Sequence, residues 1–124
     1  MTWRKAPRAL IDLFDRVIPD DRRIARRRMF GYPAVFVNGN LFAGLHQESF
    51  ILRLSEADRA RARTEHGADT FEPMAGRPMR EYVALPEALL SDRGALGDWI
   101  ARSLAYGASL PRKQKKPRKP KRAK

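Results

Sequence analysis

Residues 29–44 read MFGYPAVFVNGNLFAG, which is the most strongly patterned stretch of this 124-residue chain. The stretch is apolar and aromatic, and Asn38 and Gly39 interrupt it. Asn-Gly is the pair most typical of a two-residue type I′ turn, because both central residues need a positive φ. The runs 34–37 and 41–45 on either side have the length and composition of strands. We therefore predict a β-hairpin that turns at Asn38 and Gly39.

The turn also predicts how the two strands pair. A two-residue connection places Val37 opposite Asn40 and Val35 opposite Phe42. A third strand is predicted at 50–54, where residues alternate between two faces. Aromatic side chains along such strands could stack on nucleotide bases, but they are far more often core residues that bury a large apolar area. We therefore expect the phenylalanines of this region to fill the core.

Helices and further strands are predicted on both sides of this meander. Amphipathic spacing of apolar residues predicts helices at 6–18 and 92–110, and a capping pattern predicts another at 56–66. The runs 70–74 and 79–85 are strand-like. The order is then α-β-β-β-α-β-β-α. Short links between successive strands favour an α+β, two-layer fold, in which helices pack mainly on one face of an antiparallel five-stranded sheet.

The helix predicted at 56–66 has clear ends. Ser55 is expected to cap its first turn, with Asp58 three residues further on, and Gly67 is expected to end it in a left-handed conformation. Its sequence, EADRARARTEH, contains almost no large apolar side chain. We expect it to be exposed or only lightly packed.

The segment 20–28, DDRRIARRR, contains five arginines and is ambiguous between a short helical turn and the lead-in to a strand. In a helix, four of these arginines would share one broad face, which could bind phosphates bidentately. The alternative is a solvated surface in a protein that is rich in arginine. The candidate nucleic-acid-binding residues of this segment are Arg22, Arg23, Arg26, Arg27 and Arg28.

The end of the chain is the most basic part of the sequence. The formal net charge is +12, and the last fourteen residues carry six lysines, three arginines and no acid, which leaves 12 − 9 = +3 for the rest. We divide the chain into a folded domain, 1–110, and a disordered Lys/Arg/Pro-rich tail, 111–124, because the tail has almost nothing apolar to bury. Its candidate nucleic-acid-binding residues are Arg112, Lys113, Lys115, Lys116, Arg118, Lys119, Lys121, Arg122 and Lys124.

This tail predicts non-specific association with nucleic acid, since clustered positive charge binds phosphates without reading bases. The alternative is a tail that only keeps the protein in solution.

Several other classes of site find no support in the sequence. The chain has no cysteine, which excludes disulfides and thiolate metal sites. His46 and His66 lack a cluster of further ligands, so we expect solvated histidines, no metal site and no cofactor. We find no catalytic constellation of residues. No apolar run has the length of a membrane span or the form of a signal peptide, so we expect a cytoplasmic protein without a membrane partner.

The residues Met29-Phe30-Gly31, preceded by arginines and followed by Asn38-Gly39 and Phe42, resemble the start of the N-terminal domain of the TfoX/Sxy family of bacterial competence regulators. The runs 71–74 and 82–86 are similar to two later strands of that family. The resemblance covers about residues 8–108. It implies an α+β domain like the type III secretion-chaperone fold, with no cofactor and no enzymatic reaction. Tyr32-Pro33 stands where the family has a second glycine.

Three functions are consistent with these patterns. The first is a non-enzymatic TfoX-like regulatory or adaptor domain, active in transcription regulation, whose tail associates with DNA or RNA. The second is a small ligand-binding or enzymatic domain with a polar pocket at the sheet, using Arg53, Glu72, Arg80 and Tyr82. The third is a protein-binding, chaperone-like homodimer.

Overall fold

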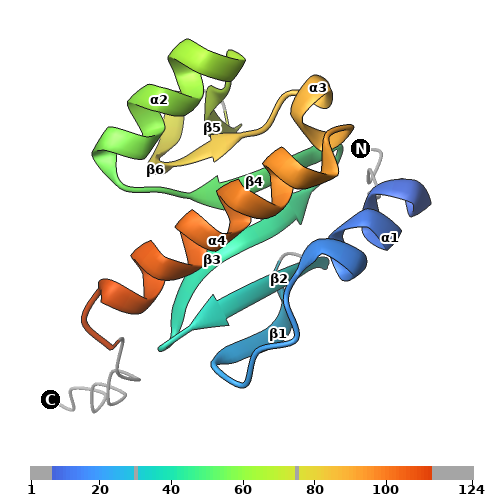
Figure 1. Ribbon diagram of the computed structural model, residues 1–124, viewed down its shortest axis with the longest axis vertical. Helices are drawn as coiled ribbons and strands as arrows, with labels where there is room; N and C mark the ends of the chain where they lie inside the picture. The colour runs from blue at the N-terminus through green and yellow to red at the C-terminus, as the bar shows by residue number, and fades with distance from the viewer. Residues whose placement is uncertain (1–6, 30, 75, 113–124) are drawn as a thin grey trace, which may run out of the picture.

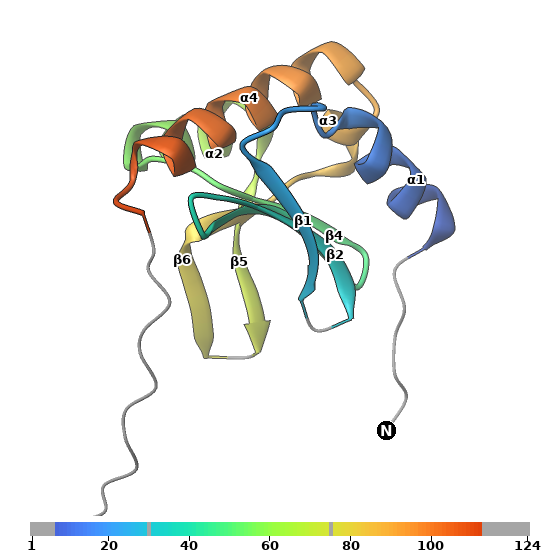
Figure 2. The same cartoon turned by 90° about the horizontal axis from the view of Figure 1, so that it is seen from below.

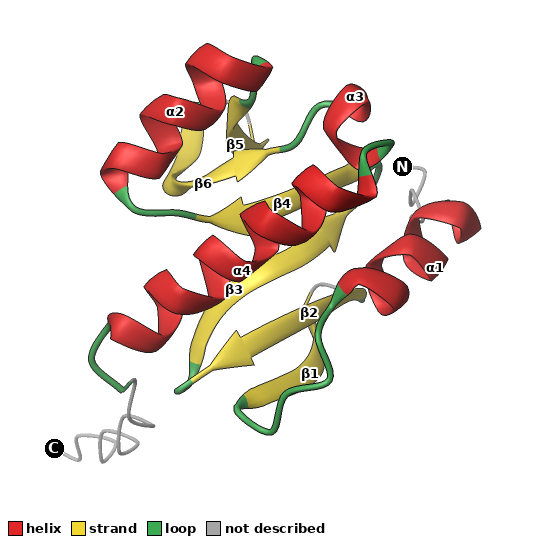
Figure 3. Cartoon of the chain, viewed as in Figure 1, coloured by secondary structure: helices red, strands yellow, loops and turns green. Residues whose placement is uncertain are grey.

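A computed structural model describes residues 7–29, 31–74 and 76–112, so Phe30 and most of the tail lie outside the described residues. The chain forms four helices and six strands within these ranges (Figure 1; Figure 3). In chain order they are α1 Arg8–Val17, β1 Ile24–Met29, β2 Tyr32–Val37, β3 Asn40–His46, β4 Ser49–Arg53, α2 Glu56–His66, β5 Asp69–Met74, β6 Arg77–Ala84, α3 Glu87–Leu90 and α4 Arg93–Ser109.

The strands form one antiparallel sheet in the order β1-β2-β3-β4-β6-β5. The helices lie on one face of this sheet, which confirms the α+β fold with two layers (Figure 2). The expectation of five strands was wrong, because 24–29 forms a sixth strand at the edge of the sheet. Apolar and polar residues hardly alternate along this strand, because most of its side chains are exposed. The strand is held by backbone pairing with β2 at the edge of the sheet, which needs no such alternation.

The β2–β3 turn is the predicted one. Asn38 has φ 54° and Gly39 has φ 77°, the two positive values that a type I′ turn needs. Val37 pairs with Asn40 as expected, but Val35 pairs with Ala43 rather than with Phe42. The register shifts by one residue beyond Phe36, so Phe42 is the extra residue of a β-bulge on β3.

The bulge directs the Phe42 side chain into the core beneath α4. Phe42 is fully buried, and a Cβ on Gly107 of α4 would lie 3.3 Å from the Phe42 Cβ. The same Cβ would lie 2.7 Å from a methyl group of Val37. Glycine at 107 therefore allows α4 to approach the β2–β3 hairpin closely. Phe14 of α1 meets Phe50 of β4 with ring centroids 5.3 Å apart, which anchors the other end of the core.

The predicted ends of α2 are confirmed. The Ser55 Oγ accepts a hydrogen bond from the Asp58 amide at 3.2 Å, and Gly67 ends the helix with φ 71°. Ala62 is the one fully buried residue of α2, so the helix packs lightly, as expected. The predicted final helix is α4, whose first turn is capped by the Asp92 carboxylate accepting from the Ala95 amide at 3.1 Å.

The sheet bends away from the helices at both ends, so that β1–β2 and β5–β6 flank its other face (Figure 2). A row of mostly small residues crosses the centre of the sheet, where Ala34 pairs with Gly44, Gly44 with Ile51 and Ile51 with Ala84. Small side chains and a glycine in a strand permit such a bend. Ala34 and Ile51 are buried there without belonging to the main core under the helices.

Candidate nucleic-acid interface

The five arginines of 20–28 do not share a helical face, because Arg26, Arg27 and Arg28 lie on β1. Successive residues of a strand point to opposite faces. Arg27 pairs with Ala34, whereas Arg26 pairs with the core residue Val35, so the two side chains leave the sheet in opposite directions. The helical alternative for this segment was therefore wrong, and the arginines spread around an edge strand.

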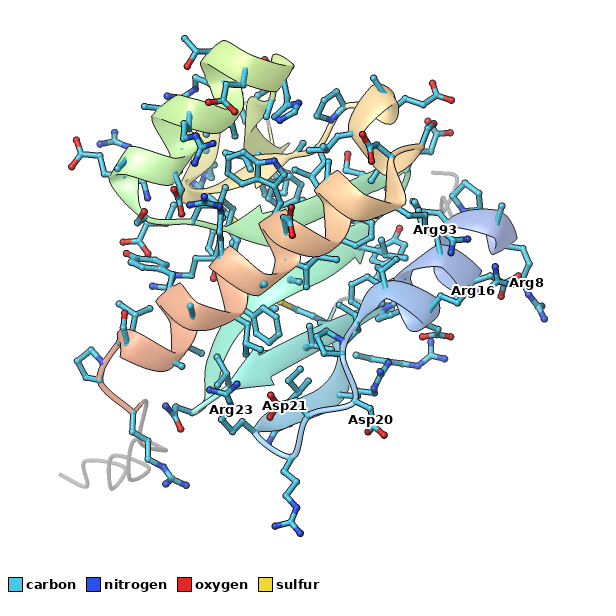
Figure 4. The ribbon with its side chains drawn as sticks, in the orientation of Figure 1. Arg8, Arg16, Asp20, Asp21, Arg23 and Arg93 are labelled. Carbon is cyan, nitrogen blue, oxygen red and sulfur yellow. The ribbon has the colours of Figure 1, made fainter. Side chains whose placement is uncertain are left out.

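Arg23 is bound to the acidic residue that precedes it by two positions. Its Nη2 lies 2.8 Å from Asp21 Oδ2 and its Nε lies 3.0 Å from Oδ1, while its backbone amide donates to Oδ1 at 2.8 Å. These bonds, first the side-chain pair and then the backbone bond, lower the pKa of the Asp21 carboxyl to about 2. Arg23 is thus neutralised within its own turn, at the end of the sheet where Figure 4 labels both residues.

The other arginines of this segment differ in how free their charges are. Arg26 lies 3.7 Å from the Asp15 carboxylate of α1. Arg28 donates to the Gly31 carbonyl at 3.1 Å, and the Arg27 guanidinium lies 5.6 Å from the centre of the Phe36 ring. The partners of Arg27 and Arg28 are therefore uncharged. Arg22 is exposed, and no carboxylate of the described residues lies within ion-pair distance of it. Arg22, Arg27 and Arg28 therefore keep their positive charge at the surface.

The start of the tail is held beside the β2–β3 turn. Asn40, which is 8% exposed, donates from Nδ2 to the Pro111 carbonyl at 3.2 Å, and Asn38 donates to the Ala108 carbonyl at 3.4 Å. Val37, next to this turn, pairs with Ile24 at the beginning of β1. Exposed Arg112 thus follows directly on a segment that is tied to the end of the sheet where β1 begins, whereas Arg27 and Arg28 lie toward the other end of that strand. Lys113 to Lys124, and the predicted roles of their charges, lie outside the described residues.

Asn38 and Asn40 also anchor the end of α4, a role that the turn pattern alone does not predict. The hairpin pattern places Asn40 on the core face, although its side chain is polar. A buried amide side chain needs a hydrogen-bond partner. That signal could have indicated an anchor. Its partner is 71 residues away, so nothing local identifies it.

The residues of the predicted motif have structural positions. Met29 ends β1, and Gly31 has φ 83° in the β1–β2 turn, where a side chain would be strained. Tyr32 begins β2 and is buried. Among the described phenylalanines of the motif, Phe42 fills the core, whereas Phe36 is half-buried beneath Arg27.

The four polar residues of the alternative pocket are only partly brought together. Arg53 lies 2.6 Å from Glu81 and its guanidinium lies 5.6 Å from the centre of the Tyr82 ring. The Tyr82 hydroxyl donates to the Leu41 carbonyl at 3.2 Å, and burial raises the Tyr82 pKa. Glu72 accepts from the Gly76 amide in the β5–β6 turn, and Arg80 lines a separate hollow. The structure therefore unites Arg53 with Tyr82 but not with the other two.

Both histidines are more enclosed than expected. His46 lies between Tyr32 and Phe71, with ring centroids 5.3 Å from each, and burial lowers its pKa. His66 meets the Trp99 ring edge-on at 5.6 Å. Between residues 7 and 112, leaving out 30 and 75, no group of three or more acidic or histidine side chains is arranged to hold a metal ion. In the same part of the chain, no helix has the length and apolarity of a membrane span.

Two comparisons bear on the relationships of this domain. No curated protein matches the chain. The family model described as the TfoX N-terminal domain matches residues 15–106, which is well over half of the 124 residues and runs from α1 into α4. This match confirms the resemblance carried by the hairpin motif. The chain belongs to the TfoX N-terminal domain family.

Proposed function

We propose that this chain is a non-enzymatic regulatory or adaptor domain that associates with nucleic acid through one basic end. We define the basic end as Arg22, Arg27, Arg28 and Arg112, together with the lysines and arginines of 113–124. The observation that carries the proposal is the bond from Asn40 to the Pro111 carbonyl. It starts the tail beside the beginning of β1, at the Arg22 end of the arginine-rich segment, whereas Arg27 and Arg28 lie further along that strand.

The charges of the basic end suit phosphates rather than bases. Guanidinium groups contact phosphates in a bidentate manner, and lysine ammonium groups add compact point charges. Such contacts release counterions from the nucleic acid and read no sequence. Membership of the TfoX family supports a regulatory role, and the resemblance implies no enzymatic reaction. Binding of this kind needs neither a pocket nor a cofactor.

The test is binding to duplex DNA, and to single-stranded RNA, across a series of salt concentrations. If about five phosphates of the DNA are neutralised, log K should fall with log salt with a slope of about −4.5. A chain that ends at Arg112 keeps the Pro111 carbonyl but loses eight positive charges, so its slope should be far shallower. Equal affinity of the full and shortened chains at every salt concentration would contradict the proposal.

A second comparison tests the folded part of the basic end. The double variant Arg22→Gln/Arg28→Gln should make the slope of log K against log salt less negative by about two units, one for each phosphate that is no longer neutralised. Arg27 is left in place because it covers Phe36. The matched control is Arg16→Gln/Arg93→Gln, which removes the same charge from exposed arginines near α1, away from the C-terminal segment (Figure 4). If both double variants change the slope equally, the folded domain attracts DNA only by its overall charge, and β1 is not part of the interface.

A further inference from the structure

A hollow of about 500 Å³ lies between α2 and the β5–β6 hairpin, at the edge of the sheet opposite to β1. Its volume is within the range of small-molecule sites. The lining contains three arginines and one glutamate, so its formal charge is 3 − 1 = +2. The lining residues are Glu56, Arg59, Ala60, Arg63, Thr70, Pro78 and Arg80.

Two of the arginines are held in place by uncharged partners. Arg59 and Arg63 are one helical turn apart and therefore lie on the same face of α2. Arg59 donates from Nη1 to the Leu54 carbonyl at 2.7 Å, and Arg63 donates from Nη2 to the Thr70 hydroxyl at 2.5 Å. Each guanidinium has five N–H donors, so most of them remain available. These bonds orient both groups without neutralising their charge.

The third arginine approaches from the sheet. Arg80 lies on β6, is exposed, and has no carboxylate within 4 Å among the described residues. Glu56 lines the hollow but is not within ion-pair distance of any of its three arginines. The hollow thus gathers three cationic side chains that lack an ionic partner in the described part of the chain.

Elsewhere the protein pairs many of its arginines with acids. Arg61, on the same helix, lies 2.8 Å from Glu65, and Arg102 of α4 lies 3.1 Å from Asp58. Carboxylate partners are also within 4 Å of Arg8, Arg23, Arg26 and Arg53. Like charges one turn apart destabilise a helix, and a bound anion would relieve that repulsion at Arg59 and Arg63. The hollow therefore has the charge and the donors of an anion site.

We propose that this hollow binds the phosphate group of a small phosphorylated ligand. Guanidinium groups match the oxygens of a phosphate in pairs, and donors from a helix and a strand would approach the group from two sides. The rest of the ligand would occupy the remaining volume, along Ala60 and Pro78. The site is independent of the basic end, because β5 and β6 form the opposite edge of the sheet from β1.

The experiment is a calorimetric titration of the full chain with inorganic pyrophosphate at fixed ionic strength. Arg80→Gln should weaken binding by about tenfold, the usual effect of losing hydrogen bonds to a charged group. Arg80→Lys should recover part of the affinity, since it restores the charge but not the paired donors. The matched control is Arg77→Gln, which removes the same charge from an exposed residue of β6 outside the lining.

Three results would overturn the proposal. If Arg77→Gln weakens binding as much as Arg80→Gln, pyrophosphate is held by diffuse charge rather than by the hollow. If duplex DNA displaces pyrophosphate and Arg80→Gln removes DNA binding, the hollow is a contact for nucleic acid and not for a small ligand. Unfolding temperatures of each variant, measured by circular dichroism, should equal that of the unaltered protein, because Arg80 is exposed and makes no described ion pair. Retained pyrophosphate binding by the folded Arg80→Gln protein would likewise reject the site.

Discussion

At the scale of single residues, the same amino acid has opposite roles at two places on α4. A Cβ on Gly107 would lie 2.7 Å from a methyl group of Val37, closer than such atoms approach in proteins. Val37 is buried and its β-branched side chain is stiff, so it cannot easily move aside. At Gly97, nothing in the described part of the chain lies within 4 Å of the position that a Cβ would take.

We predict that Gly107→Ala destabilises the protein, whereas Gly97→Ala stabilises it. Overpacking at position 107 costs about 1–3 kcal/mol, which exceeds the gain of up to about 1 kcal/mol that alanine brings in a helix. At position 97 the helix gain stands alone, at about 0.5–1 kcal/mol. Urea unfolding of the two variants measures both changes. A stabilised Gly107→Ala protein would show that α4 can move away from the hairpin.

At the scale of elements, the bulge on β3 and the helix above it depend on one serine. Ser103 of α4 is fully buried, and its hydroxyl lies 2.7 Å from the carbonyl oxygens of both Phe42 and Arg53. A β-bulge disturbs the backbone ladder and leaves polar groups that need other partners. The serine hydroxyl provides one at the bulged residue, Phe42. It therefore connects α4 to both central strands, β3 and β4.

We predict that Ser103→Ala lowers the free energy of unfolding by about 1–3 kcal/mol, the cost of depriving buried carbonyl groups of a donor. Ser109→Ala is the control, because its hydroxyl donates to the Tyr106 carbonyl at an exposed position. That variant should change stability by less than about 0.5 kcal/mol. Denaturant unfolding of the two proteins distinguishes them, and equal stabilities would mean that the bulge does not need the serine.

The arginines of β1 also protect the open edge of the sheet. Its exposed backbone could pair with another chain, and arginines along such an edge oppose pairing with a second copy by charge repulsion. The segment keeps this property whether or not it binds nucleic acid. The proposed interface therefore uses charges that also protect an open edge of the sheet.

At the scale of the whole molecule, we expect the fold not to depend on the charges beyond Arg112. The family match ends at residue 106, and the bond to Pro111 is the last described tie between the chain end and the sheet. We predict that a chain ending at Arg112 unfolds at the same temperature as the full chain. A chain ending at Leu110 loses the acceptor of Asn40, which costs about 1 kcal/mol and lowers the unfolding temperature by about 4 °C.

Thermal unfolding followed by circular dichroism measures both shortened chains. A lower unfolding temperature for the chain ending at Arg112 would show that the basic residues beyond it support the fold, and the division into domain and tail would then be wrong.

Much of this architecture could be predicted from local patterns. Asn38 and Gly39 adopt the positive φ values of the expected turn, and Ser55 and Gly67 end α2 as expected. These features depend on interactions within a few residues, which the sequence displays directly. The family was likewise recognisable from the hairpin motif. The fold class followed because short connections leave few antiparallel arrangements.

The remaining features depend on residues that are distant in the chain. The bulge at Phe42 lies where α4 packs against β3, and the anchor at Asn40 forms because Pro111 returns beside it. Strand β1 is a local exception, because it pairs with the neighbouring β2, but its mostly exposed side chains give it little of the alternation that predicts a strand. The hollow gathers arginines from α2 and β6. The amino-acid sequence alone determined turns, caps, fold class and family, since these arise from local chemistry. Some ion pairs, such as Arg23 with Asp21, are also local, but tertiary structure alone decided the pairs between distant residues, such as Arg102 with Asp58, and which arginines converge on the hollow. Those contacts form only when distant segments pack together.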